Sequence, residues 1–222
     1  MTRAVLFDLD GVLIDSRAAQ LATLAGFATT VLGRRVTVDD LPADAATTPR
    51  QHVLAELGVL RAINENIWDA ATATATLTTE VFPFVAGVLV ALRAADVATG
   101  IVTLRSRRRV NWLLPPNILG LIDTVVCYED AAPKPAPDAV LLALDKLGVL
   151  PSEAVFVGDM ESDMHAARAA GVTAVGAGWG FAGPAALTRA GAAVVLPHAD
   201  DLATGLLLLV GTGQRDKHSK RS

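Results

Sequence analysis

The sequence predicts an α/β protein with a doubly wound, mostly parallel, Rossmann-like sheet and an inserted, small all-helical domain. Short apolar runs without polar alternation recur along the chain, as expected of strands that are buried on both faces of a parallel sheet. Helical patterns lie between several of these runs, and repetition of strand, helix and strand is typical of such folds. One stretch between two strands is too long for an ordinary crossover, which indicates an insertion.

The strands are expected where apolar runs end in polar residues. The first covers residues 4–7 and is followed by Asp8 and Asp10. Further strands are expected at residues 100–103, 124–126, 154–159, 173–175 and 192–196. The clearest helices between them are predicted at 138–147, after a proline-rich turn, and at 163–170, where Gly171 ends the pattern.

The insertion lies between the first strand and the next convincing one, which begins near Val97. Helices are predicted within it at about 16–32, 50–57 and 62–79. We therefore expect a core formed by residues 1–14 and 85–211, and a helical cap at 15–84. Residues 212–222 carry four basic side chains and one acidic one, and we expect them to form a flexible, solvated tail.

The composition excludes several classes of protein. With 52% hydrophobic and 19% charged residues, the 222-residue chain is not intrinsically disordered. The one cysteine, Cys127, excludes an internal disulfide, and the four histidines lack the spacing of a zinc site. The net charge of -4 is unlike a nucleic-acid-binding protein, and no apolar run approaches the roughly 20 residues of a membrane-spanning helix. We expect a cytoplasmic protein without a signal peptide, with no nucleic-acid or membrane partner, as a monomer or homodimer.

Polar residues that suit a phosphate site follow the expected strands. Ligands of open parallel sheets bind beyond the carboxyl ends of the strands. We therefore expect the following side chains to converge in one crevice: Asp8, Asp10, Thr103, Lys134, Asp159 and Asp163. Clustered carboxylates repel one another unless a cation lies among them, and all-oxygen ligation suits Mg²⁺. A lysine and a hydroxyl at the same edge supply the donors that a bound phosphate needs.

In order and spacing, these residues resemble the four motifs of the haloacid dehalogenase superfamily, in the branch of phosphoglycolate phosphatases and β-phosphoglucomutase with a helical cap. The resemblance covers residues 5 to about 202, and the late segment from Gly178 to Phe181 is also similar to that branch. The motifs stand here as Asp8-Leu9-Asp10-Gly11, Thr103 after Ile101-Val102, Lys134-Pro135-Ala136-Pro137-Asp138 and Gly158-Asp159-Met160-Glu161-Ser162-Asp163.

The resemblance implies roles for the four acids. Asp8 would attack phosphorus and form an aspartyl phosphate. Asp10 would first protonate the leaving alcohol and then deprotonate the hydrolytic water. Mg²⁺ would be bound by Asp8, Asp159 and the backbone carbonyl of Asp10, with Asp163 helping directly or through the other ligands.

The resemblance also implies which residues hold the substrate. Thr103 and Lys134 would bind the phosphoryl oxygens, together with the motif residue Gly11 and the backbone N–H of Leu104, which stands where the family commonly has a small polar residue. Arg50, in a cap segment similar to the one that reads substrate in the family, would pair with a second phosphate or a carboxylate. An ordinary exposed arginine at a helix start is the alternative.

A run of arginines follows Thr103 and is unusually basic for this place: Arg105, Arg107, Arg108 and Arg109. We interpret it as a solvated helix face, with recognition of an anionic substrate as the alternative.

The function expected is that of a Mg²⁺-dependent phosphomonoester hydrolase acting on a small phosphorylated metabolite such as phosphoglycolate or a sugar phosphate. A sugar phosphomutase of the β-phosphoglucomutase type would use the same core residues and is the alternative. A catalytically silent binding protein is disfavoured because every core catalytic position is occupied.

Overall fold

A computed structural model of the chain describes residues 3–59, 63–76 and 79–212. The chain divides into two compact units: Met1–Leu13 with Val81–Ser222, called the core unit, and Ile14–Glu80, called the helical unit. We expected the insertion to end at residue 84. The residues just after Glu80 belong to the core unit instead, because the Phe82 N–H donates to the Leu13 carbonyl at 3.0 Å and the Phe84 ring contacts Trp179. Residues 213–222 of the expected tail lie outside the described residues.

The core unit is built on a six-stranded sheet with the order β5-β4-β1-β6-β7-β8, in which every neighbouring pair is parallel. The predicted α/β class and parallel sheet are thereby confirmed. The strands are β1 (Arg3–Phe7), β4 (Val97–Val102), β5 (Thr124–Val126), β6 (Ala154–Gly158), β7 (Thr173–Ala177) and β8 (Val194–Leu196).

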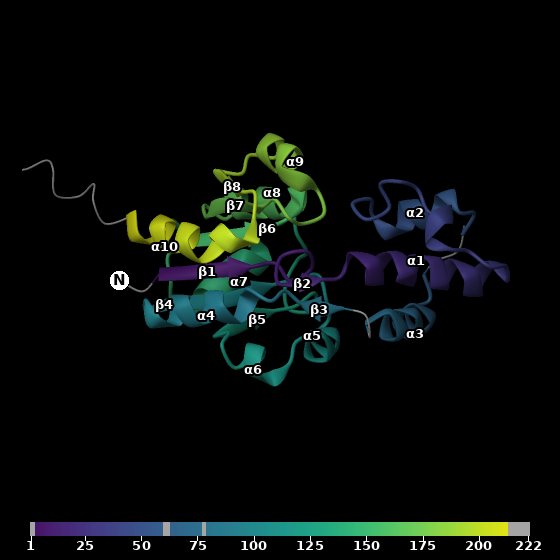
Figure 1. The fold of residues 1–222 in the computed structure, drawn as a ribbon, viewed down its shortest axis with the longest axis horizontal. Helices are drawn as coiled ribbons and strands as arrows, with labels where there is room; N and C mark the ends of the chain where they lie inside the picture. The colour runs from purple at the N-terminus through teal and green to yellow at the C-terminus, as the bar shows by residue number, and fades with distance from the viewer. Residues whose placement is uncertain (1–2, 60–62, 77–78, 213–222) are drawn as a thin grey trace, which may run out of the picture. The chain divides into compact units, whose positions relative to one another are not determined.

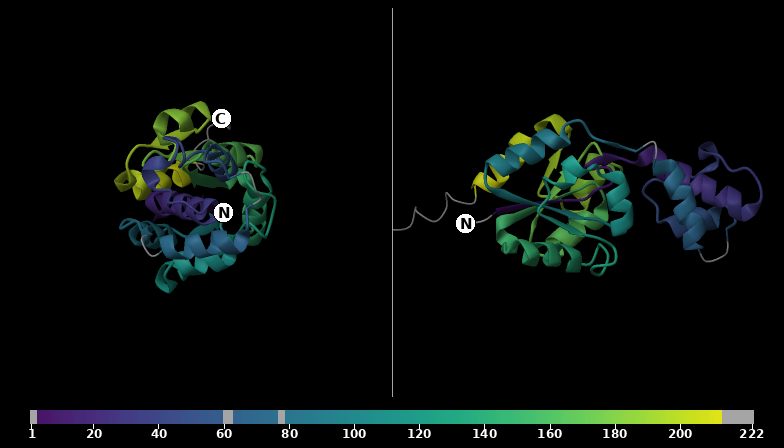
Figure 2. Two further views of the ribbon diagram at one scale, coloured as in Figure 1. Left: turned by 90° about the vertical axis from the view of Figure 1, so that its right-hand side faces the viewer. Right: turned by 90° about the horizontal axis from the view of Figure 1, so that it is seen from below.

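Helices cover both faces of this sheet (Figures 1 and 2). On one face α4 and α10 contact each other, and α7, α8 and α9 pack in sequence against the strands on the other. The helices of the core unit are α4 (Val85–Ala94), α5 (Arg107–Leu113), α6 (Pro116–Leu119), α7 (Asp138–Leu147), α8 (Glu161–Ala169), α9 (Gly183–Arg189) and α10 (Leu202–Thr212), with 3-10 turns η2 (Pro151–Glu153) and η3 (Ala199–Asp201). Among the described residues, no helix is both long and apolar enough to cross a membrane.

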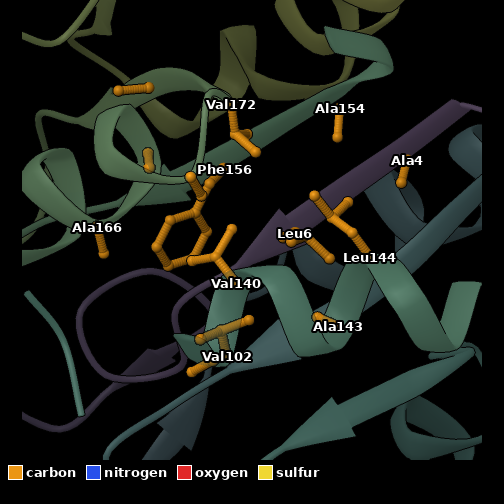
Figure 3. Packing of buried hydrophobic residues seen from close by; sticks show 14 of the residues in the cluster. Ala4, Leu6, Val102, Val140, Ala143, Leu144, Ala154, Phe156, Ala166 and Val172 are labelled. Carbon is orange, nitrogen blue, oxygen red and sulfur yellow. The ribbon is translucent and has the colours of Figure 1, made fainter. Parts of the chain in front are cut away.

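A large apolar cluster lies between the sheet and α7 and α8. Figure 3 shows Val140 and Leu144 of α7 beside Leu6 of β1 and Phe156 of β6, and all four side chains are buried. Burial of a side chain of this size contributes roughly 1.5–3 kcal/mol. Residues 4–7 of β1 are fully buried on both faces of the sheet, which is why the sequence shows an apolar run there instead of alternation.

The helical unit has a small apolar core of its own. It contains α1 (Arg17–Leu32), α2 (Arg50–Glu56), α3 (Glu65–Thr76) and the 3-10 turn η1 (Val38–Asp40). Phe27 of α1 meets Trp68 of α3 edge to face, with ring centroids 5.4 Å apart. The predicted third helix is shorter than expected, and residues 62, 77 and 78 of that prediction lie outside the described residues. Two short strands, β2 (Ile14–Asp15) and β3 (Glu80–Val81), pair with each other at the ends of this unit.

Candidate active site

The carboxyl ends of β1, β4 and β6 meet at one edge of the sheet. Phe7 at the end of β1 pairs with Ile101 of β4 on one side and with Val157 of β6 on the other. The next residue, Asp8, donates its N–H to the Val157 carbonyl at 2.8 Å. The register therefore places the polar residues that follow these three strands at the same edge, as the sequence predicted.

Three carboxylates converge there and are buried. One oxygen from each of Asp8, Asp159 and Asp163 lies within 4.8 Å of the others. Burial, together with the charges of Asp163 and Asp10, raises the pKa of Asp8 to about 7, although Lys134 opposes the shift. Burial also raises the pKa of Asp159, and the charges of Asp8 and Asp163 act in the same direction. This carboxylate cluster is therefore poorly compensated by protein groups alone.

Lys134 is the cation inside the cluster. Its Nζ lies 2.9 Å from Asp8 Oδ1 and 2.6 Å from Asp163 Oδ1, and its side chain is only 3% exposed. Burial disfavours the charged ammonium, but the two carboxylates outweigh burial and raise the pKa of Lys134 above its usual value. Lys134 thus remains charged next to Asp8, where a buried lysine without partners would lose its proton.

Helix α8 fixes the position of Asp163. Asp163 Oδ2 accepts hydrogen bonds from the backbone N–H groups of Asp159 at 3.1 Å and Met160 at 3.0 Å. At the start of a helix such N–H groups have no acceptor within the helix itself. The other oxygen of Asp163 faces Lys134. Although it lies 2.6 Å from Lys134 Nζ, Asp163 Oδ1 is buried and accepts no hydrogen bond from the described residues, so Asp163 also offers an oxygen to a metal ion.

Asp159 is held differently. Its Oδ2 accepts the Phe181 N–H at 2.7 Å, whereas its Oδ1 is buried and has no hydrogen-bond partner among the described residues. A Cβ on Gly11 or on Gly180 would overlap the Asp159 side chain. A Cβ on Gly158 would likewise overlap Asp163. The acids can approach one another only because these three positions are glycines.

These features fit a divalent metal ion. An unpartnered buried carboxylate oxygen is costly, and three clustered acids face a single ammonium. Carboxylate oxygens are the ligands that hard cations such as Mg²⁺ prefer. The three acids present therefore suit such an ion.

Asp10 takes a different partner. Arg105 Nε donates to Asp10 Oδ2 at 2.8 Å and Arg105 Nη2 donates to Asp10 Oδ1 at 2.7 Å, and each of these side chains is 16% exposed. The side-chain oxygens of Asp10 are thus engaged outside the carboxylate cluster. The expected contribution of Asp10 to metal binding concerns its backbone carbonyl and stays a prediction.

The interpretation of the arginine run as a solvated helix face is wrong for Arg105. Helix α5 begins only at Arg107, so Arg105 lies in the turn before the helix and points to Asp10. Burial disfavours its charge, but Asp10 and Asp8 outweigh burial and raise the pKa of Arg105. Arg107 and Arg108 are exposed, as a solvated face requires.

The structure places the other predicted residues as follows. Thr103 is buried at the end of β4, and its Oγ1 accepts the Arg105 N–H at 3.1 Å. Leu104 is 50% exposed, and Gly11 has a φ of 71° in the turn after Asp10. Arg50 begins α2 in the helical unit, where its guanidinium lies 4.7 Å from the centre of the Trp68 ring. The binding roles of these residues stay predictions.

The sequence analysis did not predict three contributions to the site. They are the paired hydrogen bonds from Arg105 to Asp10, the hydrogen bond from the Phe181 N–H to Asp159, and the close approach of Asp159 to Gly180. The segment from Gly178 to Phe181 carried a signal, since its glycines follow a buried strand. Nothing local distinguished Arg105 from the arginines after it.

The chain matches the haloacid dehalogenase-like hydrolase family over residues 5–177. It is 35% identical over 196 residues to pyrophosphatase PpaX of Bacillus velezensis, which covers 83% of this chain and 87% of the relative. It is 34% identical over 189 residues to phosphoglycolate phosphatase of Xylella fastidiosa, which covers 81% of each chain.

Solved structures agree with these matches. A haloacid dehalogenase family hydrolase from Deinococcus radiodurans, solved with bound phosphate and sodium, has a TM-score of 0.71 at 27% identity and covers 93% of this chain and 96% of its own. A haloacid dehalogenase-like hydrolase from Streptococcus pneumoniae has a TM-score of 0.76 at 20% identity. The match covers 92% of this chain and 98% of that protein, and it shows that the two share a fold. The family match over more than half of the chain, with the acids at the sheet edge, shows that this protein belongs to the haloacid dehalogenase-like hydrolases and is a phosphatase of that family.

Proposed function

We propose that the chain is a Mg²⁺-dependent phosphomonoester hydrolase that forms an aspartyl phosphate on Asp8 and acts on a small phosphorylated metabolite. The observation that carries this proposal is the buried cluster of Asp8, Asp159 and Asp163, with Lys134 2.9 Å from Asp8 Oδ1. A carboxylate that attacks a phosphate dianion must be held close to positive charge, since the two anions otherwise repel each other.

The first step transfers the phosphoryl group to Asp8. A carboxylate oxygen of Asp8 forms a bond to phosphorus while the bond to the leaving oxygen breaks, and Asp10 gives that oxygen a proton. Lys134 keeps the Asp8 carboxylate in place throughout. When bound at Asp8 and Asp159, Mg²⁺ supplies positive charge that offsets the repulsion between Asp8 and the phosphoryl oxygens.

The second step returns Asp8 to its starting state. Asp10, now ionised, takes a proton from a water molecule whose oxygen attacks phosphorus. The bond between phosphorus and the Asp8 oxygen breaks, and inorganic phosphate leaves. One group thus serves as acid and then as base, so no net proton is lost from the enzyme.

Phosphoglycolate is the first substrate to test, with pyrophosphate and sugar phosphates next. Relatives named phosphoglycolate phosphatase and pyrophosphatase, each about one third identical to this chain, support testing the first two substrates. Arg50 of the helical unit, half-buried over Trp68, stays a predicted substrate contact.

The test is phosphate release from these substrates with and without Mg²⁺, run beside an Asp8→Asn variant. We expect release that requires the metal and that falls at least about 1000-fold in the variant, because the amide is not a nucleophile. Metal-independent release, or release that survives in Asp8→Asn, would overturn the proposal. Interconversion of a sugar phosphate only on addition of a bisphosphate would instead show the phosphomutase.

A further inference from the structure

Arg105 has unused donors beside Asp10. Its Nε and Nη2 are the atoms that hold Asp10, whereas Nη1 has no hydrogen-bond acceptor among the residues that the structure describes. The backbone on either side is fixed, because the Arg105 N–H donates to Thr103 Oγ1 and the Arg105 carbonyl accepts the Tyr128 N–H, both at 3.1 Å. The guanidinium is therefore held in place with one edge still available, and 16% of the side chain reaches solvent.

The position of Asp10 indicates which part of a bound substrate would contact the available guanidinium edge of Arg105. Lys134 is occupied by Asp8 and Asp163, on the side of the site that receives the phosphoryl group. Asp10, in the proposed function, faces the leaving oxygen. The available edge of Arg105 thus lies beside the leaving group and not beside the transferred phosphoryl group.

We propose that Arg105 determines substrate specificity: one edge of its guanidinium holds Asp10, and Nη1 binds an anionic group carried by the leaving group. This inference rests on the proposed function and narrows it to phosphate esters and anhydrides whose leaving group carries a carboxylate or phosphate close to the bridging oxygen. A planar guanidinium can serve both anions at once because its donors point in fixed, separate directions. A lysine ammonium has no such second edge.

Arg107 and Arg108 do not share this arrangement. Arg107 Nη2 is bound to Asp130 at 2.5 Å and to the Val125 carbonyl at 3.3 Å. Arg108 is exposed, and its guanidinium lies 4.5 Å from the centre of the exposed Trp112 ring. Arg108→Gln is therefore a matched control that removes the same charge outside the site.

The test compares two substrates that differ only at the far end of the leaving group. Phosphoglycolate carries a carboxylate, and 2-hydroxyethyl phosphate carries a hydroxymethyl group in its place. We expect the wild type and Arg108→Gln to prefer phosphoglycolate in kcat/KM, and Arg105→Gln to lose roughly 10- to 100-fold of that preference, the range for a hydrogen bond to a charged group. An equal loss of kcat/KM on both substrates would show that Arg105 only positions Asp10. An unchanged kcat/KM on both substrates would show that Arg105 does not contact the leaving group. Either result overturns the inference.

A binding measurement separates this inference from the proposed function. Titration calorimetry in the presence of Mg²⁺ compares 3-phosphonopropionate, an uncleavable analogue with a carboxylate, with propylphosphonate, which lacks it. We expect the wild type to bind the first more tightly and Arg105→Gln to bind both alike, whereas an equal affinity of the wild type for the two would contradict the role of Arg105. Absence of phosphate release by the wild type would overturn the hydrolase and leave this readout intact. If Arg105→Gln does not fold, Arg105→Lys replaces it, with a smaller loss of preference expected.

Discussion

Gly180 gives Asp159 its place in the site. A Cβ at this position would overlap the Asp159 side chain, whose Oδ2 is tied to the adjacent Phe181 N–H at 2.7 Å. The Asp159 carboxylate cannot move away from such a Cβ without losing its hydrogen bond to the Phe181 N–H. The glycine is thus required by the close approach of a charged side chain and not by an unusual backbone angle.

Gly180→Ala is expected to lower Mg²⁺ affinity and phosphate release by about 10- to 100-fold, as displacement of groups that orient a metal ligand does. Calorimetric titration with Mg²⁺ and phosphate-release assays measure the two losses. The control is Gly87→Ala on the exposed face of α4, where a Cβ meets nothing within 4 Å. It is expected to leave activity unchanged and to raise the free energy of unfolding by about 0.5–1 kcal/mol. Equal effects of the two changes would contradict the role of Gly180.

The raised pKa of Asp8 predicts a pH dependence of metal binding. Because the folded chain without metal raises this pKa from 3.8 to about 7, the protonated carboxyl is favoured below pH 7. As the pH rises from about 4 to about 7, the metal-free fold therefore loses stability through this group. Mg²⁺ binds the ionised form, so its affinity should rise over the upper part of this range.

The measurement is the increase in Tm caused by a fixed excess of Mg²⁺, at pH 5.5 and at pH 8. We expect the larger increase at pH 8, and proton release on binding at pH 6 in calorimetry. An increase that is the same at both pH values would show that Asp8 is not a ligand.

At the scale of elements, local signals predicted bounds closely. Helix α7 was expected at 138–147 and spans Asp138–Leu147, because prolines precede it and Gly148, with a φ of 65°, ends it. Burial on both faces of the sheet leaves an uninterrupted apolar run, which located the strands, although the bounds of β4, β7 and β8 differ from the predicted ones by up to three residues. The bounds of the third helix of the insertion were predicted too wide, because its N-cap was not recognised: Asn64 Oδ1 accepts the N–H groups of Asn66 at 3.0 Å and Ile67 at 3.2 Å.

The site was predicted as far as it depends on strand ends. The register of parallel strands dictates that Asp8, Thr103 and Asp159 share an edge, so a sequence with recognisable strands reveals them. The Arg105–Asp10 pair joins residues 95 positions apart through side chains alone. The hydrophobic periodicity of the sequence does not predict which arginine in the run contacts a carboxylate far away in the chain.

The helical unit owes its own stability to the α1 and α3 contact. Phe27→Ala removes a ring that is 1% exposed and that packs on Trp68, with an expected loss of about 3–5 kcal/mol. Hydrogen exchange by mass spectrometry should show faster exchange in α1 and α3, with little change in β1 and β6 of the core unit. Val90→Ala, on an exposed site of α4, is the control and should leave both regions unchanged. Uniformly faster exchange in both units after Phe27→Ala would show that they do not unfold separately.

For the whole molecule, the division into two units separates two tasks. The core unit carries the acids and Lys134, which are the groups that the proposed phosphoryl transfer needs. The helical unit carries Arg50 and none of the carboxylates of the cluster. Substitutions in the helical unit are therefore expected to change which substrate is used more than whether phosphoryl transfer occurs.

The central claim is that Asp8 carries the phosphoryl group during turnover. An Asp10→Asn variant, incubated with Mg²⁺ and acetyl phosphate, should accumulate this intermediate, because acetate leaves without a proton but hydrolysis lacks its base. Acid quenching followed by peptide mass spectrometry locates the phosphoryl group. We predict that it is found on Asp8. A phosphoryl group on any other residue, or none at all while the wild type turns over, would contradict the account.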